Sequence, residues 1–73
     1  MYIGWYELLP GVCIYLYDYF VDSVGINKVH IRLQVGNNMK DHKLKIYTNK
    51  HDSNYVVTKW GRIYLDKFKI IHR

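Results

Sequence analysis

The stretch KVHIRLQV, residues 28–35, decides how the rest of the chain is interpreted. Its apolar residues alternate strictly with its polar ones, and such alternation is typical of a strand with one face buried and one in water. The apolar side chains should therefore face a core, whereas Lys28, His30 and Arg32 should face solvent.

The composition of the whole chain favours strands over helices. Alanine is absent, and Glu7 and Gln34 are the only residues of their types, although all three types are strong helix formers. The chain is instead rich in tyrosine, isoleucine and valine, which suit a pleated surface. With 49% hydrophobic residues, it has enough apolar material for a core. We expect an all-β or nearly all-β protein.

Turn signals divide the chain into short segments of strand character. Pro10-Gly11 ends a first segment and precedes the apolar run 12–21. Glycine and asparagine predict a turn over 36–42, followed by a strand over 43–48. A hairpin over 55–65 should be bulged at Gly61, and one 3₁₀ turn at 66–68 should precede a last strand at 69–72.

Within the run 12–21, Leu16-Tyr17-Asp18-Tyr19 resembles the ALYDY motif that opens Src-homology-three domains. The acidic loop, paired tryptophan and G-x-x-P-x-N-Y segment of that family do not follow, so the resemblance implies no binding of proline-rich peptides. Strand count alone predicts a single domain over 1–73, a small half-open barrel of five or six short antiparallel strands. Its geometry would be Src-homology-three-like or oligonucleotide-binding-like.

Charge is distributed unevenly along the chain. Residues 1–27 contain three acidic residues and no lysine or arginine. Residues 28–73 contain all eleven lysines and arginines against three acidic residues, a net charge of +8 within a total of +5. Such asymmetry favours a polyanionic partner.

The cations of residues 28–48 should gather on one surface. If strands 28–35 and 43–48 pair, their outward side chains share a face. The predicted basic face consists of Lys28, His30, Arg32, Lys43, Lys45 and Tyr47, with Lys40 and His42 in the connecting loop. No acidic residue is expected among them, which favours a partner of opposite charge over the alternative that the charges serve only solubility. Tyr47 is the aromatic residue best placed to stack on a base.

Three further tyrosines, Tyr15, Tyr17 and Tyr19, should share one face of the strand over 12–21. Three interpretations stay open for them: stacking on bases, packing in the core, or contact with a protein partner or a second subunit.

No catalytic or metal-binding pattern is present. Cys13 lies in an apolar run, where thiols are usually unreactive, and the four histidines lack the spacing of a zinc site. A single cysteine indicates a reducing compartment. Glu7, Pro10 and Asp18 interrupt the apolar N-terminal region, which argues against a signal or membrane segment. We expect a cytoplasmic protein with no enzymatic activity, no cofactor, no metal and no membrane partner.

Two classes of function are compatible with these features. The first is a small binding protein whose basic face engages nucleic acid or a nucleoprotein complex. The second is a protein inhibitor of the kind encoded by phages or mobile elements, which would occlude a host or defence complex through residues 12–22 or through the basic face. The abundance of lysine, isoleucine, tyrosine and asparagine, typical of AT-rich coding, agrees with such an origin. A symmetric oligomer assembled through residues 12–21 is a third possibility.

Overall fold

The computed structural model describes residues 2–70, which are nearly all β. The elements are β1 (Gly4–Leu9), β2 (Val12–Val21), β3 (Asn27–Val35), β4 (Asn38–Lys45), β5 (Tyr47–Thr48), β6 (Asn54–Thr58), β7 (Gly61–Tyr64), the 3₁₀ turn η1 (Leu65–Lys67) and β8 (Lys69–Ile70). The predicted fold class is confirmed. The described residues form eight strands where five or six were predicted, and two of them, β5 and β8, are each only two residues long.

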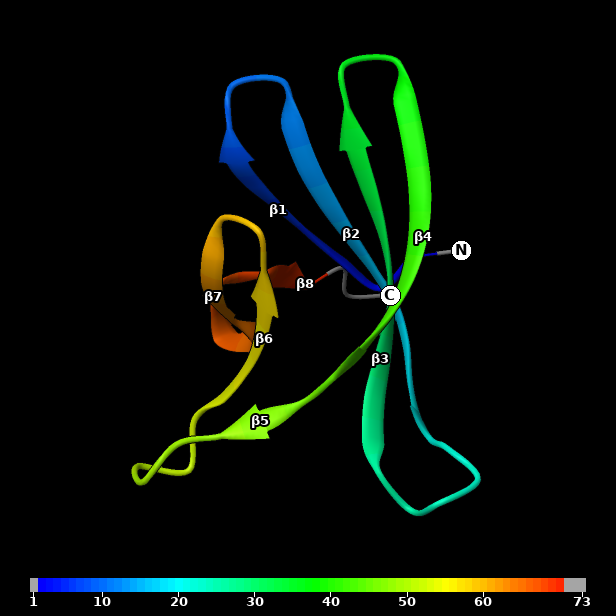
Figure 1. The fold of residues 1–73 in the computed structure, drawn as a ribbon. Coiled ribbons are helices and arrows are strands. Elements are labelled where there is room, and N and C mark those ends of the chain that lie inside the picture. Colours follow the sequence, from blue (N-terminus) through cyan, green and yellow to red (C-terminus); the bar gives the residue numbers. More distant parts are fainter. Residues whose placement is uncertain (1, 71–73) are drawn as a thin grey trace.

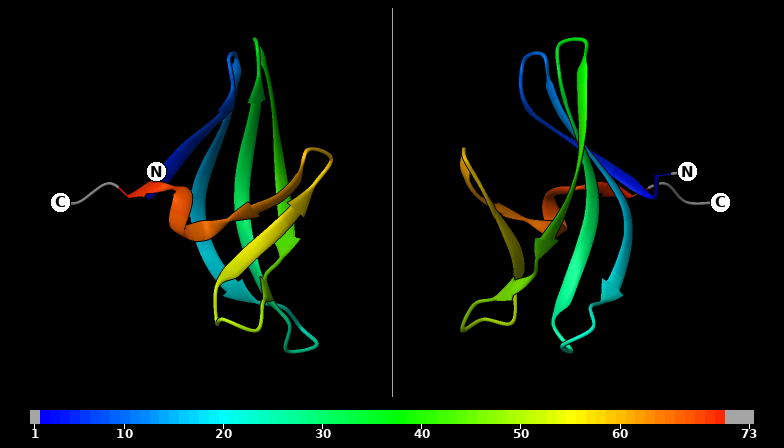
Figure 2. Two further views of the ribbon diagram at one scale, coloured as in Figure 1. Left: turned by 90° about the vertical axis from the view of Figure 1, so that its left-hand side faces the viewer. Right: turned by 45° about the vertical axis from the view of Figure 1, so that its right-hand side comes forward.

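The strands form two antiparallel sheets. The larger, sheet A, has the order β4-β3-β2-β1-β8, and the smaller, sheet B, has the order β5-β6-β7. Sheet B lies across one face of sheet A, which we call the inner face, and the two sheets diverge at one end (Figures 1 and 2). The result is a half-open barrel that does not close.

Alternation along the strands builds the core between the two sheets. In β3, Val29 and Ile31 are almost fully buried, whereas Lys28, His30 and Arg32 lie on the opposite, outer face. The core residues are Ile14, Leu16, Val29 and Ile31 of sheet A, Val56 and Ile63 of sheet B, and Phe68 after η1. The core thus draws on both sheets, and its burial is the main force that holds them together.

The turn predicted over 36–42 is wrong in its extent. Gly36 and Asn37 alone connect β3 to β4, and Gly36 adopts a positive φ of 59°, as such short hairpin turns require. Strand β4 therefore starts at Asn38, and Lys40 and His42 belong to a strand instead of a loop.

The strand predicted over 43–48 is interrupted at Ile46. The backbone N–H of Ile46 donates a hydrogen bond to the carbonyl of Asn27 at 3.0 Å. Beyond it, Tyr47 and Thr48 pair with β6. The chain thus passes at Ile46 from sheet A to sheet B.

The C-terminal part follows the prediction more closely. The hairpin of β6 and β7 is present, but the predicted bulge at Gly61 is wrong, because pairing runs without a shift from Thr58–Gly61 to Tyr55–Tyr64. The 3₁₀ turn is confirmed one residue earlier than predicted. Strand β8 pairs with β1 at Gly4, and residues 71 and 72 of the predicted last strand lie outside the described residues.

Candidate functional site

The outer face of sheet A brings together five of the predicted basic residues. They are Lys28, His30 and Arg32 of β3 and Lys43 and Lys45 of β4. Lys28 lies opposite Lys45, and His30 lies opposite Lys43, in the antiparallel register of the two strands. The alternation of both strands therefore gathers these basic residues on one side, as the sequence predicts.

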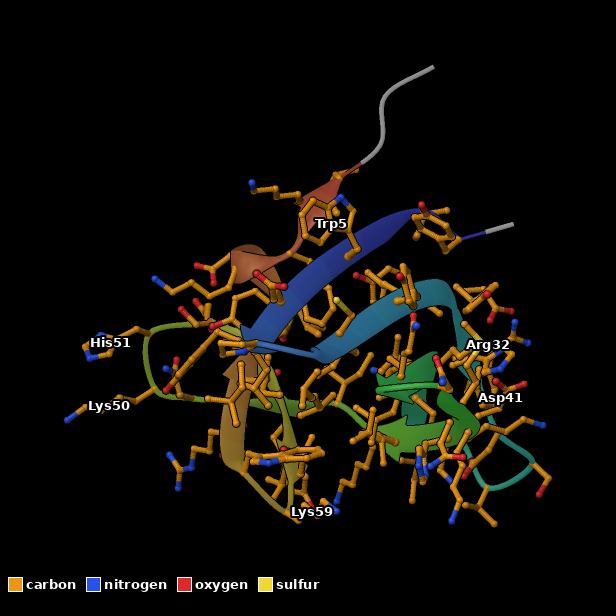
Figure 3. The ribbon with its side chains drawn as sticks, turned by 90° about the horizontal axis from the view of Figure 1, so that it is seen from above. Trp5, Arg32, Asp41, Lys50, His51 and Lys59 are labelled. Carbon is orange, nitrogen blue, oxygen red and sulfur yellow. The ribbon has the colours of Figure 1, made fainter. Side chains whose placement is uncertain are left out.

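Acidic residues share this face, so the prediction that it carries none is wrong. Arg32 Nε donates a hydrogen bond to Asp41 Oδ1 at 2.7 Å, and the two side chains lie together in Figure 3. His30 lies between two carboxylates, with Nδ1 3.4 Å from Asp18 and Nε2 3.5 Å from Asp41. The hydrogen bond from Arg32 lowers the pKa of Asp41 and raises the pKa of Arg32. Much of the positive charge at this end of the face is therefore balanced within the protein.

The remaining cations of the face differ in their partners. Lys28 Nζ lies 3.3 Å from Asp22. Lys43 and Lys45 take part in none of the ion pairs found among residues 2–70 and instead lie over aromatic rings. Lys43 Nζ is 5.7 Å from the ring centroid of Phe20, and Lys45 Nζ is 4.9 Å from that of Tyr47. These two lysines at the end of β4 are the cations best able to meet an external anion.

Lys40 does not lie on this face. It pairs with Leu33 and shares the inner face of sheet A with His42, because β4 begins earlier than predicted and both residues follow its alternation. Lys40 and the five outer basic residues therefore do not form a single surface.

Tyr47 lies at the start of a row of tyrosines on sheet B. Tyr47 pairs with Tyr55, and Tyr55 pairs with Tyr64, so one ring comes from each strand. The ring centroids are 5.5 Å apart in both steps, and the Tyr47 and Tyr55 rings are nearly parallel, at 17°. We call Tyr47, Tyr55 and Tyr64 the tyrosine ladder. It lies on the side of sheet B opposite the buried Val56 and Ile63.

Two cations flank the tyrosine ladder. Lys45 lies over Tyr47, and Arg62 Cζ lies 4.9 Å from the ring centroid of Tyr55. Stacking on a base was predicted from the sequence for Tyr47 but not for Tyr55 or Tyr64. The two-residue turn Lys59-Trp60 is the feature that could have indicated them, because it fixes the hairpin register and so places residues 55 and 64 opposite each other.

The tyrosines of β2 do not share one face, so that prediction is wrong. The register of β2 against β3 shifts between Leu16 and Asp18, which makes Tyr17 the extra residue of a bulge. Tyr15 and Tyr17 stay on the outer face, where Tyr17 stacks on His30 with centroids 5.2 Å apart. Tyr19 pairs with Val29 and turns towards the opposite side.

A groove opens where the two sheets diverge, with a volume of about 360 Å³. Ile31, Leu33 and Leu44 of sheet A lie along its floor, and Val57 and Trp60 of the β6–β7 hairpin line its wall. No feature of the sequence taken alone indicated this groove, because it depends on how the hairpin sits relative to β4.

Other kinds of site are not found in the part of the chain that the structure describes. Residues 2–70 contain no group of three or more histidine, cysteine or acidic side chains that could hold a metal ion. No helix within them has the length and apolar character needed to cross a membrane. Cys13 is a free, half-buried thiol on β2.

Searches against protein-family models, curated proteins and solved structures find no match to this chain. The geometry of its surfaces is therefore the basis for a functional assignment.

Proposed function

We propose that the protein binds single-stranded nucleic acid, without catalysis, across the tyrosine ladder and the two lysines at the end of β4. The observation that carries the proposal is the row of three tyrosine rings, spaced 5.5 Å apart and flanked by Lys45 and Arg62. Aromatic rings in a row accept stacked bases, and neighbouring cations neutralise the phosphates between them. The lone Cys13 agrees with a cytoplasmic location.

Charge supports a nucleic acid as the ligand. Residues 28–73 carry a net charge of +8 and supply the whole of this surface. Lys45 lies over Tyr47 of the ladder, and Lys43 lies two residues before it on the same face of β4. Neither lysine has a carboxylate partner among the ion pairs of residues 2–70. An anionic chain that runs from β4 onto sheet B would meet these lysines first and the rings next.

The shape of the surface favours a single strand over a duplex. Stacking on a protein ring requires a base that is free of its own neighbours, as in single-stranded segments. Direct reading of a duplex usually places a helix or a two-stranded ribbon in the major groove. The ladder instead spans three strands of a small sheet, with Tyr47 39% exposed at its edge.

The test is fluorescence anisotropy with a labelled oligothymidine and an oligouridine of about twelve nucleotides, a length within the site sizes of small barrels. Affinity should fall steeply between about 50 and 200 mM salt. Tyr47→Ala should cost about 1–3 kcal/mol of binding free energy, the usual worth of one stacked base. Tyr19→Ala is the matched control, because Tyr19 is an exposed tyrosine, 51% against 39% for Tyr47, and belongs to sheet A whereas the ladder belongs to sheet B.

The lysines are tested by charge reversal. Lys43→Glu with Lys45→Glu should abolish binding, and Lys50→Glu with Lys67→Glu, exposed in a loop and in η1, changes the net charge equally at a distance from β4. No binding at low salt, binding that ignores salt, or equal losses in the two double variants would refute the proposal.

A protein partner is the second candidate, and an aromatic cluster on the outer face of sheet A favours it. The ring centroids of Tyr2 and Tyr15 are 4.8 Å apart, and Arg32 Cζ lies 5.1 Å from that of Tyr17. Tyrosine and arginine are enriched among the residues that dominate protein interfaces. An inhibitor of a host complex, of the kind encoded by phages, would use such a cluster.

Nuclease treatment separates the two candidates. A stoichiometric protein partner that survives nuclease and is lost in Tyr17→Ala, but not in Tyr19→Ala, supports the protein-binding function. Assembly of identical subunits through residues 12–21 stays a prediction. Both edges of β2 are already paired, with β1 and β3, so a second copy could contact β2 only through its side chains.

A further inference from the structure

The groove between the sheets combines an apolar floor with a cationic rim. The floor is aliphatic, formed by Ile31, Leu33 and Leu44. Lys40 and His42 of β4 line the groove on one side. Lys59 lines it on the other side, at the tip of the β6–β7 hairpin (Figure 3). An apolar depression of this size is within the usual range of ligand sites.

All the ionisable side chains that line the groove are basic residues. Lys59 Nζ lies 4.7 Å from the ring centroid of Trp60, a cation–π contact that favours its position at the rim. The carboxylate nearest in sequence on β4, Asp41, lies on the other face of the sheet and is bound to Arg32. A ligand that enters the groove therefore gains from negative charge at the rim and from apolar groups at the floor.

Strand β4 borders the groove and forms the edge of sheet A. It pairs only with β3 among the strands described, so alternate residues along its eight-residue length direct their N–H and C=O groups away from the sheet. Strand β6 would be its next neighbour in a closed barrel, but the two strands are not paired, and they move apart towards the β3–β4 turn (Figures 1 and 2). The open side of the barrel is thus a strand edge beside an apolar groove.

The side chains of β4 select among the strands that could add to this edge. Strand β4 carries Lys40, Lys43 and Lys45 against Asp41 alone, so a second copy of β4 beside this edge would bring two positively charged strands together, which destabilises a sheet. An acidic strand would meet the same lysines favourably. The edge therefore opposes pairing with its own copy and favours an acidic segment of another protein.

We propose that the groove and the edge of β4 bind an extended, acidic segment of a partner protein, in which the residues that face the groove, every second one, include both apolar and acidic side chains. The segment adds as a strand to β4, so that its backbone pairs with the free edge groups. Its apolar side chains rest on Leu33 and Leu44, and its carboxylates meet Lys40 and Lys59. This site lies on the inner face of sheet A and is separate from the tyrosine ladder.

The test uses labelled synthetic peptides of about ten residues, long enough to cover β4. A peptide that repeats Val-Ser-Glu-Ser, and so turns both valine and glutamate to one face of a strand, should bind with saturable anisotropy. Two control peptides should not: a repeat of Val-Ser-Lys-Ser, and the valine–glutamate composition arranged in two blocks. In a Trp5→Phe background, Trp60 is the only remaining tryptophan, and its emission should shift as the peptide fills the groove.

Charge reversal at the rim gives the sharpest comparison. Lys40→Glu with Lys59→Glu should weaken binding of the valine–glutamate peptide about tenfold or more and gain binding of the valine–lysine peptide. Lys50→Glu with Lys67→Glu, which changes the net charge equally, should leave the preference intact. Equal effects of the two double variants, equal binding of the block peptide, or binding of dodecanoate but of no peptide would overturn the proposal. Oligonucleotide binding lost in Tyr47→Ala with peptide binding kept would show that the two sites are separate.

Discussion

Single side chains set much of the electrostatic behaviour of this protein, and Asp22 is the clearest case. Its Oδ1 accepts hydrogen bonds from the backbone N–H groups of Val24 and Ile26, at 3.0 and 2.9 Å, and so organises the turn between β2 and β3. The hydrogen bond from the backbone N–H of Ile26 contributes most to lowering the pKa of Asp22, and the side chain of Lys28 lowers it further. Asp41 has its pKa lowered mainly by Arg32.

These two carboxylates should make the protein sensitive to acid. A carboxyl group with a lower pKa in the folded than in the unfolded state stabilises the fold above its unfolded value, 3.8 here, and loses this effect as the pH falls through the folded pKa. We expect Asp22→Asn and Asp41→Asn to flatten the decline in the free energy of unfolding below about pH 4. Urea unfolding at a series of pH values below and above about 4, followed by tryptophan fluorescence, measures the free energy of unfolding of each variant.

Asp66→Asn is the control for this prediction. Asp66 is exposed in η1 and takes part in no ion pair or side-chain hydrogen bond found among residues 2–70. Its replacement should leave the acid limb of the curve unchanged. Acid curves for Asp22→Asn and Asp41→Asn that run parallel to the wild type would contradict the assignment.

At the scale of elements, the small sheet is attached to the large one through alternate residues of β6. Val56 is fully buried in the core, and its neighbour Val57 is 50% exposed at the wall of the groove. The same substitution, valine to alanine, can therefore be compared at one buried and one exposed position of β6.

We expect Val56→Ala to lower the free energy of unfolding by about 2 kcal/mol, from the lost burial of two carbon atoms and the space they leave. Val57→Ala should change it by less than about 0.5 kcal/mol, as is usual for surface sites. Urea denaturation of both variants measures the difference. Equal losses would mean that sheet B is not held by its inward face.

The observed strand boundaries show which elements can be predicted from the sequence. Strands β2 and β3 could be placed within a residue, because Pro10-Gly11 and the alternation over 28–35 are local signals. Strand β4 could not, since the polar run before Lys43 has the composition of a turn. It becomes a strand only through pairing with β3, a contribution from residues distant in sequence.

The candidate site was predictable from the sequence only where it depends on local signals. The outward placement of Lys28, Lys43 and Lys45 follows from alternation within each strand. The tyrosine ladder and the displacement of Tyr19 depend on register, which a two-residue turn and a one-residue bulge decide. Neither can be inferred from periodicity alone.

For the whole molecule, the position of its charges bears on association. Most side chains of β4 are exposed, and lysines occupy the edge of sheet A at Lys40 and Lys43. Such lysines are a common protection against edge-to-edge pairing. This edge should therefore not pair with the same edge of a second copy at micromolar concentration, because like charges repel.

We therefore expect Lys40→Thr with Lys43→Thr to promote self-association, since threonine suits a strand and carries no charge. Sedimentation velocity over a concentration series would reveal the heavier species. Lys50→Thr with Lys67→Thr removes the same charge from positions outside the sheets and should remain monomeric. If the β4 variant does not self-associate, the lysines are not what prevents pairing at this edge.

The pairing of β1 with β8 has a consequence for how this fold can be used. Gly4 lies opposite Ile70, and a Cβ at Gly4 would stand only 3.1 Å from the carbonyl oxygen of Lys69, so the two strands are closely apposed. Polypeptide can thus enter and leave the domain at neighbouring points. A short linker between these points would allow circular permutation, with new ends cut at the Gly36-Asn37 turn, and would equally allow the domain to be grafted into a surface loop of a host protein.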